Sequence, residues 1–381
     1  MPKVDLLIKG GEVIDPASKT RGKLDVAVSQ GRIAAIGPDL PLDAASQVDA
    51  TGKLVVPGLI DLHTHLGFEL HTVVLDPDDV CPPAGVTAAV DMGSTGAFTF
   101  PWYRERVLSR TLVRLFAFIN IASIGTIAIH TPYYVDNYGR YIDVRDTVRM
   151  IQENRQYIRG IKVFATDKMV GEWALMAVRA ARQVGDEVGL PVAVHVSALP
   201  PPLEEILALL HEGDILTHSF TPHDQGILDE RGQIRPSVRE ARQRGVFFDL
   251  GHGAGSFAYH VARKALEQDF LPDTISTDLY YANVHQPVKD LPTTLSKFLN
   301  LGLSLEETLA RATCNPARLI GENTLGALQV GGPADIALLT LQQGEFTYVD
   351  CVQQTLTGPW KLECAMTIAR GKIIYPREGW S

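Results

Sequence analysis

The hydrophobic pattern at both ends of the chain is that of short β-strands separated by glycine and proline turns. The amino-terminal runs are DLLIKGGEVIDP, LDVAVSQGRIAAIG and QVDATGKLVVPG, and the carboxyl-terminal runs are DIALLTL, FTYVDCV and MTIARGKIIYP. A sheet with one apolar face must bury that face against another layer. The pattern therefore predicts one small β-sandwich domain built from residues 1–56 and 322–381, with two independent β-extensions as the alternative.

Residues 57–321 have a different pattern, in which apolar strand-like runs alternate with helix-like segments. Apolar residues recur at helical spacing in WALMAVRAARQVGDEVG, LEEILALLHEG and PSVREARQRG. The eight candidate strands are VVPGLIDLHTH, VTAAVDMG, VRLFAFINIA, IRGIKVFAT, VAVHVSA, ILTHSF, VFFDLGH and TISTDLY. Eight such units predict an α/β fold, a (β/α)8 TIM barrel, whose catalytic groups lie at the carboxyl ends of the strands.

Six polar residues stand near the ends of these predicted strands. In GLIDLHTHLG the two histidines are two residues apart, so an extended strand directs both side chains to one face, where they can share a metal ion. A buried lysine in GIKVF needs a partner or must lose its charge. Alone, each residue has a structural explanation, but six at one barrel mouth indicate a site. The six are His63, His65, Lys162, His195, His218 and Asp278.

This order of residues resembles the amidohydrolase superfamily, in the subtype with two metals bridged by a carboxylated lysine. The phrases DATGKLVVPGLIDLHTHL and LGALQVGGPADIALL are similar to the superfamily. FDLGHGAGSF, PDTISTDLY and DLPTTLSKFLNLGLSLEETLARATCNPARLIG are similar to its amidohydrolase/deacetylase group, which is dihydroorotase-like. The resemblance covers nearly the whole chain.

The resemblance implies a site with two divalent metal ions, of which zinc is the first choice. His63, His65 and Asp278 would bind the more buried ion, His195 and His218 the more exposed ion, and carboxylated Lys162 (N6-carboxylysine) both. An ammonium has no lone pair for a cation, so a lysine can bridge only after it becomes a carbamate. Two ions can activate a water as hydroxide and polarise a carbonyl. Asp278 would carry the proton from this nucleophile to the leaving group.

The expected reaction is the hydrolysis of an amide or ester bond in a small N-acyl or O-acyl compound, as in a deacetylase. A cyclic amidohydrolase of the dihydroorotase or hydantoinase type is the first alternative, and a deaminase is the second. From another functional class, a non-catalytic barrel that binds a ligand or partner is a further alternative. The complete set of six residues argues against that last possibility.

Three departures from the relatives concern the substrate. Gly67 stands where dihydroorotases have an arginine, Phe164 stands where the deacetylase group has one, and Tyr280 stands where relatives tend to have histidine. Phe164 either packs in the barrel or forms a less polar pocket wall. His223 is predicted to be solvated rather than catalytic. The predicted substrate contacts are Ser94, Phe164, His252, Ser256 and Tyr280.

Composition narrows the functional class further. The chain has 381 residues, of which 45% are hydrophobic and 21% charged, as in a globular enzyme. A net charge of −9 gives no general attraction to nucleic acid or to anionic membranes. Four scattered cysteines indicate neither a disulfide framework nor a zinc ribbon. We therefore expect a cytoplasmic protein with a small-molecule substrate, and the resemblance is compatible with a homo-oligomer.

One apolar stretch, residues 112–130, has to be distinguished from a membrane span. It reads LVRLFAFINIASIGTIAIH and is interrupted by Arg114, Asn120 and Gly125. Continuous apolar runs are typical of parallel strands covered on both faces. The stretch is predicted to be a buried strand followed by the start of a loop.

Overall fold

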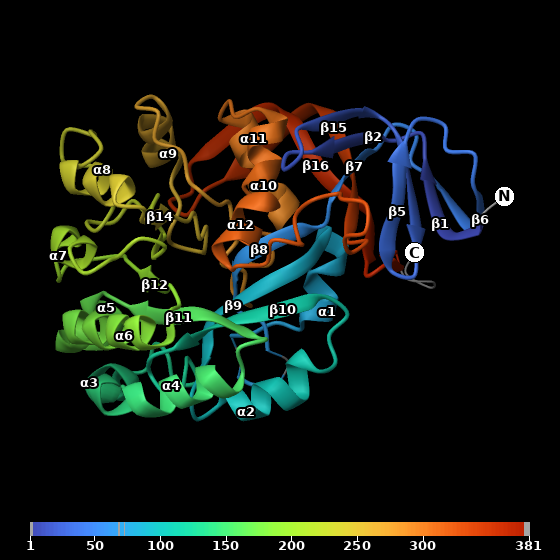
Figure 1. Ribbon diagram of the computed structural model, residues 1–381. Helices are drawn as coiled ribbons and strands as arrows, with labels where there is room; N and C mark the ends of the chain where they lie inside the picture. Colours follow the sequence, from blue (N-terminus) through green and yellow to red (C-terminus); the bar gives the residue numbers. More distant parts are fainter. Residues whose placement is uncertain (1–2, 68, 72, 377–381) are drawn as a thin grey trace.

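A parallel sheet of seven strands forms the wall of the barrel in the computed structural model, which describes residues 3–67, 69–71 and 73–376 (Figure 1). The strands are neighbours in chain order, from the first to the last. They are β8 (Leu59–Thr64), β9 (Val86–Gly96), β10 (Arg114–Asn120), β11 (Ile158–Phe164), β12 (Val192–His195), β13 (Ile215–Thr217) and β14 (Phe247–Phe248).

Residues 274–279 close the barrel between its first and last strands. Asp249, next to β14, forms a parallel bridge with Thr274, and Thr64 of β8 forms one with Leu279. The amide of Asp278 donates to the carbonyl of His63 at 2.7 Å. The predicted eighth strand therefore occupies the expected place, although its pairing is too sparse for a regular strand.

Helices cover the outside of this wall, as expected for strand–helix units (Figure 1). The predicted helix in WALMAVRAARQVGDEVG is α6, which ends where Gly189 takes a left-handed conformation with φ +65°. The α-helices are α1 (Pro77–Val80), α2 (Phe100–Tyr103), α3 (Pro132–Tyr141), α4 (Val144–Glu153), α5 (Asp167–Val170), α6 (Ala174–Val188), α7 (Leu203–Leu207), α8 (Pro236–Gln243), α9 (Tyr259–Leu266), α10 (Leu291–Asn300), α11 (Leu305–Ala310) and α12 (Cys314–Leu319). Single turns of other helix types are η1 (Pro82–Ala84), η2 (Arg104–Leu108) and η3 (Gly171–Trp173).

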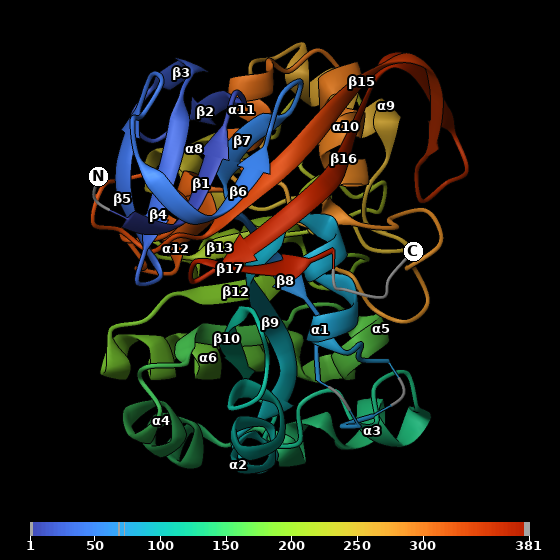
Figure 2. The ribbon, with the colours of Figure 1, turned by 90° about the vertical axis from the view of Figure 1, so that its right-hand side faces the viewer.

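Both ends of the chain contribute to a second, β-rich part beside the barrel (Figure 2). One sheet has the order β5-β4-β1-β6, and the other has the order β17-β16-β15-β7-β2-β3. The amino-terminal strands are β1 (Lys3–Lys9), β2 (Glu12–Asp15), β3 (Thr20–Lys23), β4 (Asp25–Ser29), β5 (Arg32–Gly37), β6 (Asp43–Asp49) and β7 (Leu54–Pro57). The carboxyl-terminal strands are β15 (Ile336–Val349), β16 (Thr355–Ala369) and β17 (Lys372–Tyr375).

A separate apolar core holds these two sheets together. It includes Ile8 and Val26 from the first sheet and Val13, Ile336 and Ile368 from the second. The predicted fold class, a barrel with a small β-sandwich from both chain ends, is therefore confirmed. The exact division at residues 1–56 and 322–381 stays a prediction.

The prediction of a single first barrel strand in VVPGLIDLHTH is wrong, because this segment forms two strands in different sheets. Leu54–Pro57 is β7, which pairs with β15 in the small domain, and Leu59–Thr64 is β8 in the barrel. Gly58 separates them. A Cβ atom at this glycine would lie 2.1 Å from Oγ1 of Thr87, so the chain passes from one domain to the other where only glycine fits.

The apolar stretch at residues 112–130 is confirmed as a buried strand, β10, followed by a turn region. None of the described helices combines the length and the apolar character needed to cross a bilayer.

Candidate metal centre

The structure brings all six predicted polar residues to the carboxyl ends of the barrel strands. Their places are His63 in β8, His65 directly after it, Lys162 in β11, His195 at the end of β12, His218 directly after β13, and Asp278 in the closing segment. Because parallel strands end on the same side of a barrel, this arrangement follows from the strand positions alone.

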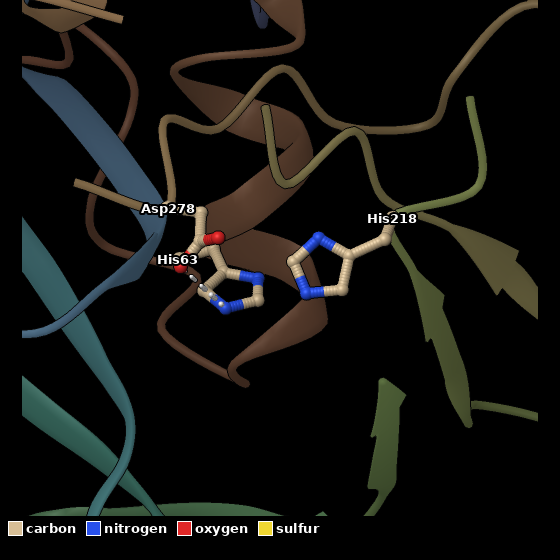
Figure 3. Close-up of side chains that lie close together, drawn as sticks. All are labelled: His63, His218 and Asp278. Atoms are coloured by element: carbon tan, nitrogen blue, oxygen red, sulfur yellow. Dashed lines mark ion pairs between the residues drawn. The ribbon is translucent and has the colours of Figure 1, made fainter. Parts of the chain in front are cut away.

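The inner four of these side chains are in direct contact. Nε2 of His63 lies 3.3 Å from Nζ of Lys162 and 3.4 Å from Oδ1 of Asp278. Nε2 of His65 lies 3.2 Å from the same carboxylate oxygen. One ligand atom each of His63, His218 and Asp278 lies within 4.8 Å of the others, and Figure 3 shows the two imidazoles facing one another beside the carboxylate.

His63 and His218 share one hydrogen-bonding pattern, in which Nδ1 bonds to a group outside the cluster. Nδ1 of His63 lies 2.8 Å from Oγ1 of Thr217, and this hydroxyl donates to Oδ2 of Asp249. Nδ1 of His218 donates to the carbonyl of Gly251 at 2.7 Å. When Nδ1 carries the proton, Nε2 keeps its lone pair. These Nε2 atoms therefore present lone pairs to the same space.

His218 provides the plainest test of whether a cation fits here. Its Nε2 is buried and has no hydrogen-bond partner among the described residues. A buried polar atom without a partner is costly unless something else binds it. Burial lowers the pKa of His218 to about 4, so the ring is neutral near pH 7. A neutral imidazole beside a carboxylate is a donor set that suits a divalent metal ion.

Burial also lowers the pKa values of two further histidines of the cluster. It lowers the pKa values of His63 and His195 well below the usual value, with the charges of Lys162 and His218 as further causes. The His195 and His218 rings are 4.2 Å apart. Neutral rings packed this closely repel neither one another nor a metal cation.

Lys162 is fully buried, and burial lowers its pKa to about 8. With this pKa, about a tenth of the amine is neutral at pH 7, and the neutral amine is the form that can react with carbon dioxide. Gly93 makes room for the side chain, because a Cβ atom there would lie 2.6 Å from Cγ of Lys162. The surroundings of Lys162 are thus compatible with an uncharged lysine, one of the two possibilities that its apolar sequence context leaves open.

The sequence analysis did not identify Asp249, a buried carboxylate that lies behind His63. Asp249 is fully buried and accepts hydrogen bonds from Thr217, Thr274 and Ser276. It also lies 3.4 Å from Nδ1 of His63. The signal was present, because Asp249 interrupts the apolar run VFFDLGH as Lys162 interrupts GIKVF.

Ser94, predicted to contact the substrate, instead lies behind His65. Its hydroxyl is 2.9 Å from Nδ1 of His65, and its amide donates to Oδ1 of Asp91. The serine is fully buried and does not line the large cavity that opens beside the cluster. The structure therefore gives Ser94 a place as an orienting partner of a histidine.

A cavity of about 680 Å3 opens beside the cluster, with His65, His195 and Asp278 on its wall. Three of the predicted substrate contacts also line it: Phe164, Ser256 and Tyr280. Phe164 packs edge-on against the His195 ring at 5.2 Å, so it is both a packing residue and an apolar wall. His223 lines the cavity too and is exposed, as predicted. His252 does not line it and is fully buried.

Comparison with known proteins identifies the family. The amidohydrolase family model matches residues 54–374, which is most of the chain. The chain belongs to the amidohydrolase family. A deacetylase of Agrobacterium fabrum is 32% identical to it over 322 residues, which is 84% of this chain and 79% of the relative.

Two solved structures are similar to this amidohydrolase over nearly its whole length. A crystal structure described as an adenine deaminase has a TM-score of 0.89 and 30% identity and covers 97% of this chain and 99% of that chain. A crystal structure described as a dihydroorotase has a TM-score of 0.88 and 28% identity. It covers 97% of this chain and 98% of that chain. The resemblance inferred from sequence is therefore confirmed. This amidohydrolase is a hydrolase that acts on small molecules, in a family that generally uses divalent metals.

Removing the hydroxyl of Ser94 is expected to weaken metal binding without unfolding the amidohydrolase. Ser94→Ala leaves Nδ1 of His65 without this partner, and loss of such outer hydrogen bonds typically costs about 10- to 100-fold in metal affinity. Competition with a chelator measures the effect. Thr95→Val is a matched control, because the buried Thr95 hydroxyl has no partner among the described residues. Equal affinities for both variants and wild type would contradict the orienting role.

A methyl group at Gly253 is expected to displace Asp278. An added Cβ atom would lie 2.4 Å from Oδ2 of Asp278, and φ is +53°. Gly253→Ala should lower kcat at least about tenfold and destabilise the fold by about 1–2 kcal/mol, the cost of a left-handed non-glycine residue. Steady-state kinetics and thermal unfolding measure these effects.

Gly255→Ala is the control in the same loop. Its added Cβ atom would meet only Nε2 of His223, at 4.0 Å, an ordinary contact. A similar loss of kcat in both variants would show that the loop, rather than the contact with Asp278, accounts for the effect.

Proposed function

We propose that this amidohydrolase is a metal-dependent deacetylase that hydrolyses the acyl bond of a small N-acyl or O-acyl compound. The observation that carries the proposal is the contact between Lys162 and His63 beside the unpartnered Nε2 of His218. A buried amine, three outward-bonded histidines and a carboxylate form one centre next to a cavity. The similarity to the deacetylase of Agrobacterium fabrum supports acyl removal.

Each side chain has a role in this proposal. His63, His65 and Asp278 would hold one divalent ion, His195 and His218 a second, and Lys162, carboxylated on Nζ, would bind both. Zinc is proposed first, because the donors are imidazole nitrogens and carboxylate oxygens. When bound, the ions would lower the pKa of a water and polarise the substrate carbonyl.

Asp278 is the proposed proton carrier. Its carboxylate lies at the cavity wall, 3.2 Å from His65 and 3.4 Å from His63. It would accept the proton of the attacking water as the carbon–oxygen bond forms. It would then deliver that proton to the leaving nitrogen or oxygen as the acyl bond breaks, so that atoms and charge balance. Phe164 and Tyr280 would shape the side of the pocket that receives the acyl compound.

A panel of substrates followed with a pH indicator tests the proposal. The metal-loaded protein would be offered N-acyl amino acids, O-acyl hydroxy acids, dihydroorotate, hydantoins and aminopurines. The proposal predicts acid release from an acyl compound, with metal-stripped protein as the control. Acid release from a ring amide alone would favour a cyclic amidohydrolase, and ammonia release would favour a deaminase. The absence of turnover by fully loaded protein would favour a non-catalytic barrel.

A further inference from the structure

The loop that follows β14 contacts two of the proposed metal ligands through its backbone. In this glycine-rich loop (residues 251–256) the carbonyl of Gly251 accepts a hydrogen bond from Nδ1 of His218 at 2.7 Å. A Cβ atom added at Gly253 would lie only 2.4 Å from Oδ2 of Asp278, so the backbone of the loop packs closely against this carboxylate. A small displacement of the loop would therefore move both the imidazole and the carboxylate.

The only imidazole of this loop points away from the cavity, into the protein. His252 is fully buried, and its Nδ1 lies 2.9 Å from the carbonyl of Gly253, to which it donates. Its Nε2 therefore keeps a lone pair, and Nζ of Lys297 lies 2.7 Å from it. Lys297 donates here to an uncharged acceptor.

Lys297 lies in α10 and is only 1% exposed. Besides His252, it donates to the carbonyl of Pro287 at 2.7 Å and to that of Val349, the last residue of β15, at 2.9 Å. No ion pair joins it to a carboxylate within the described part of the chain. Figure 1 shows α10 beside β15 and β16, which come from the carboxyl-terminal part of the chain. The amine thus connects three separate segments with three hydrogen bonds.

Burying a lysine amine in a core costs free energy that an apolar side chain would not. Burial lowers the pKa of Lys297 to about 7, and an uncharged side chain of similar length would avoid the desolvation of an ammonium. The hydrogen bonds have directional requirements that an apolar side chain lacks, so the amine fixes where His252 lies. The desolvation of Lys297 has a functional explanation if the position of His252 affects the metal centre.

We propose that Lys297 is a positioning residue, which holds the glycine-rich loop through His252 so that His218 and Asp278 keep the geometry needed for metal binding. This inference rests on the proposed metal centre. It assigns to Lys297 a role in binding and turnover without contact with substrate or metal. The same hydrogen bonds link the end of β15 to the glycine-rich loop.

The test uses cobalt(II) as a reporter that does not depend on knowing the substrate. Visible absorption of the Co2+-loaded protein reports ligand geometry, and chelator competition reports affinity. In Lys297→Met we expect an altered spectrum and about a tenfold or greater loss of Co2+ affinity. Lys297→Met leaves Nε2 of His252 and the carbonyls of Pro287 and Val349 without their donor, so a lower thermal unfolding temperature is expected as well. Lys289→Met is the control. Lys289 is an exposed lysine on the wall of a cavity that Lys297 also lines, and its substitution should leave the spectrum unchanged.

Chemical rescue distinguishes a lost hydrogen-bond donor from a lost packing group. Lys297 lines a cavity of about 330 Å3, so a small amine can reach the space that Lys297→Ala would leave. Ethylammonium chloride should restore the Co2+ spectrum of Lys297→Ala by at least half, whereas ethanol should not. This variant also serves if Lys297→Met does not fold.

Two outcomes would overturn the inference. One is a wild-type spectrum and affinity in Lys297→Met. The other is equal rescue of Lys297→Ala by ethanol and ethylammonium, which would show that only space filling matters. Neither readout requires turnover, so failure of the deacetylase proposal in the substrate panel would be seen separately from failure of this one.

Discussion

Asp278→Asn is expected to fold like the wild-type protein and to lose about three orders of magnitude in kcat. General acid–base catalysis contributes about 10²- to 10⁴-fold, and an amide cannot accept the proton of the attacking water. Asp278 has φ +49°, a left-handed conformation that asparagine tolerates better than most residues. The backbone should therefore be retained while the proton carrier is lost. Steady-state kinetics and thermal unfolding on the same preparation measure both effects.

Asp136→Asn is the matched control for this substitution. Asp136 is an exposed carboxylate on the wall of the same cavity, in α3, and makes the same change of charge possible. We expect its kcat to stay within about twofold of wild type. If Asp278→Asn keeps kcat near the wild-type value, Asp278 is not the proton carrier. If both variants lose kcat equally, the charge of the cavity, rather than proton transfer, would account for the loss.

Lys162→Ala is expected to lose most of the bound metal and, with it, more than about a thousandfold in activity. The substitution removes the proposed ligand shared by both ions, and His63 loses its neighbour at 3.3 Å. Elemental analysis of the purified variant measures the loss. Wild-type protein equilibrated with 13C-bicarbonate should show a carbamate carbon by NMR, and the variant should not.

Two controls separate the bridging role from general damage to the barrel. Lys168→Ala changes an exposed lysine on the cavity wall and should keep full metal content. A short carboxylic acid such as acetate should partly restore metal and activity to Lys162→Ala, because it supplies the missing oxygens. Unchanged metal occupancy in Lys162→Ala would exclude the bridge.

The barrel and the cluster at its mouth were predictable because polar residues interrupt apolar strands. A lysine between Ile161 and Val163 or a histidine between Val194 and Val196 has few structural explanations, and parallel strands carry such residues to one edge. The same reasoning could have found Asp249, which interrupts a strand in the same way. Its role as a partner of Thr217 and His63 depends on the neighbouring strands, which a local pattern does not specify.

The loops were less predictable, because side-chain direction in a loop depends on tertiary contacts. Ser94 and His252 were both predicted to face the substrate, yet each is buried behind the centre. Ser256 and Tyr280, from comparable loops, do line the cavity. Gly58 shows the same limit for strands, since the apolar run continues through it while the chain changes sheet. Glycines permit such turns without indicating which way the next side chain points.

The metal content of the wild-type protein distinguishes a binuclear centre from a site that holds one ion or none. The protein would be saturated with Zn2+ in the presence of bicarbonate, freed of unbound metal and analysed for zinc per chain. If the six residues at the barrel mouth form a binuclear centre, the analysis should find two zinc ions per chain. A content of one ion or fewer would contradict the binuclear centre.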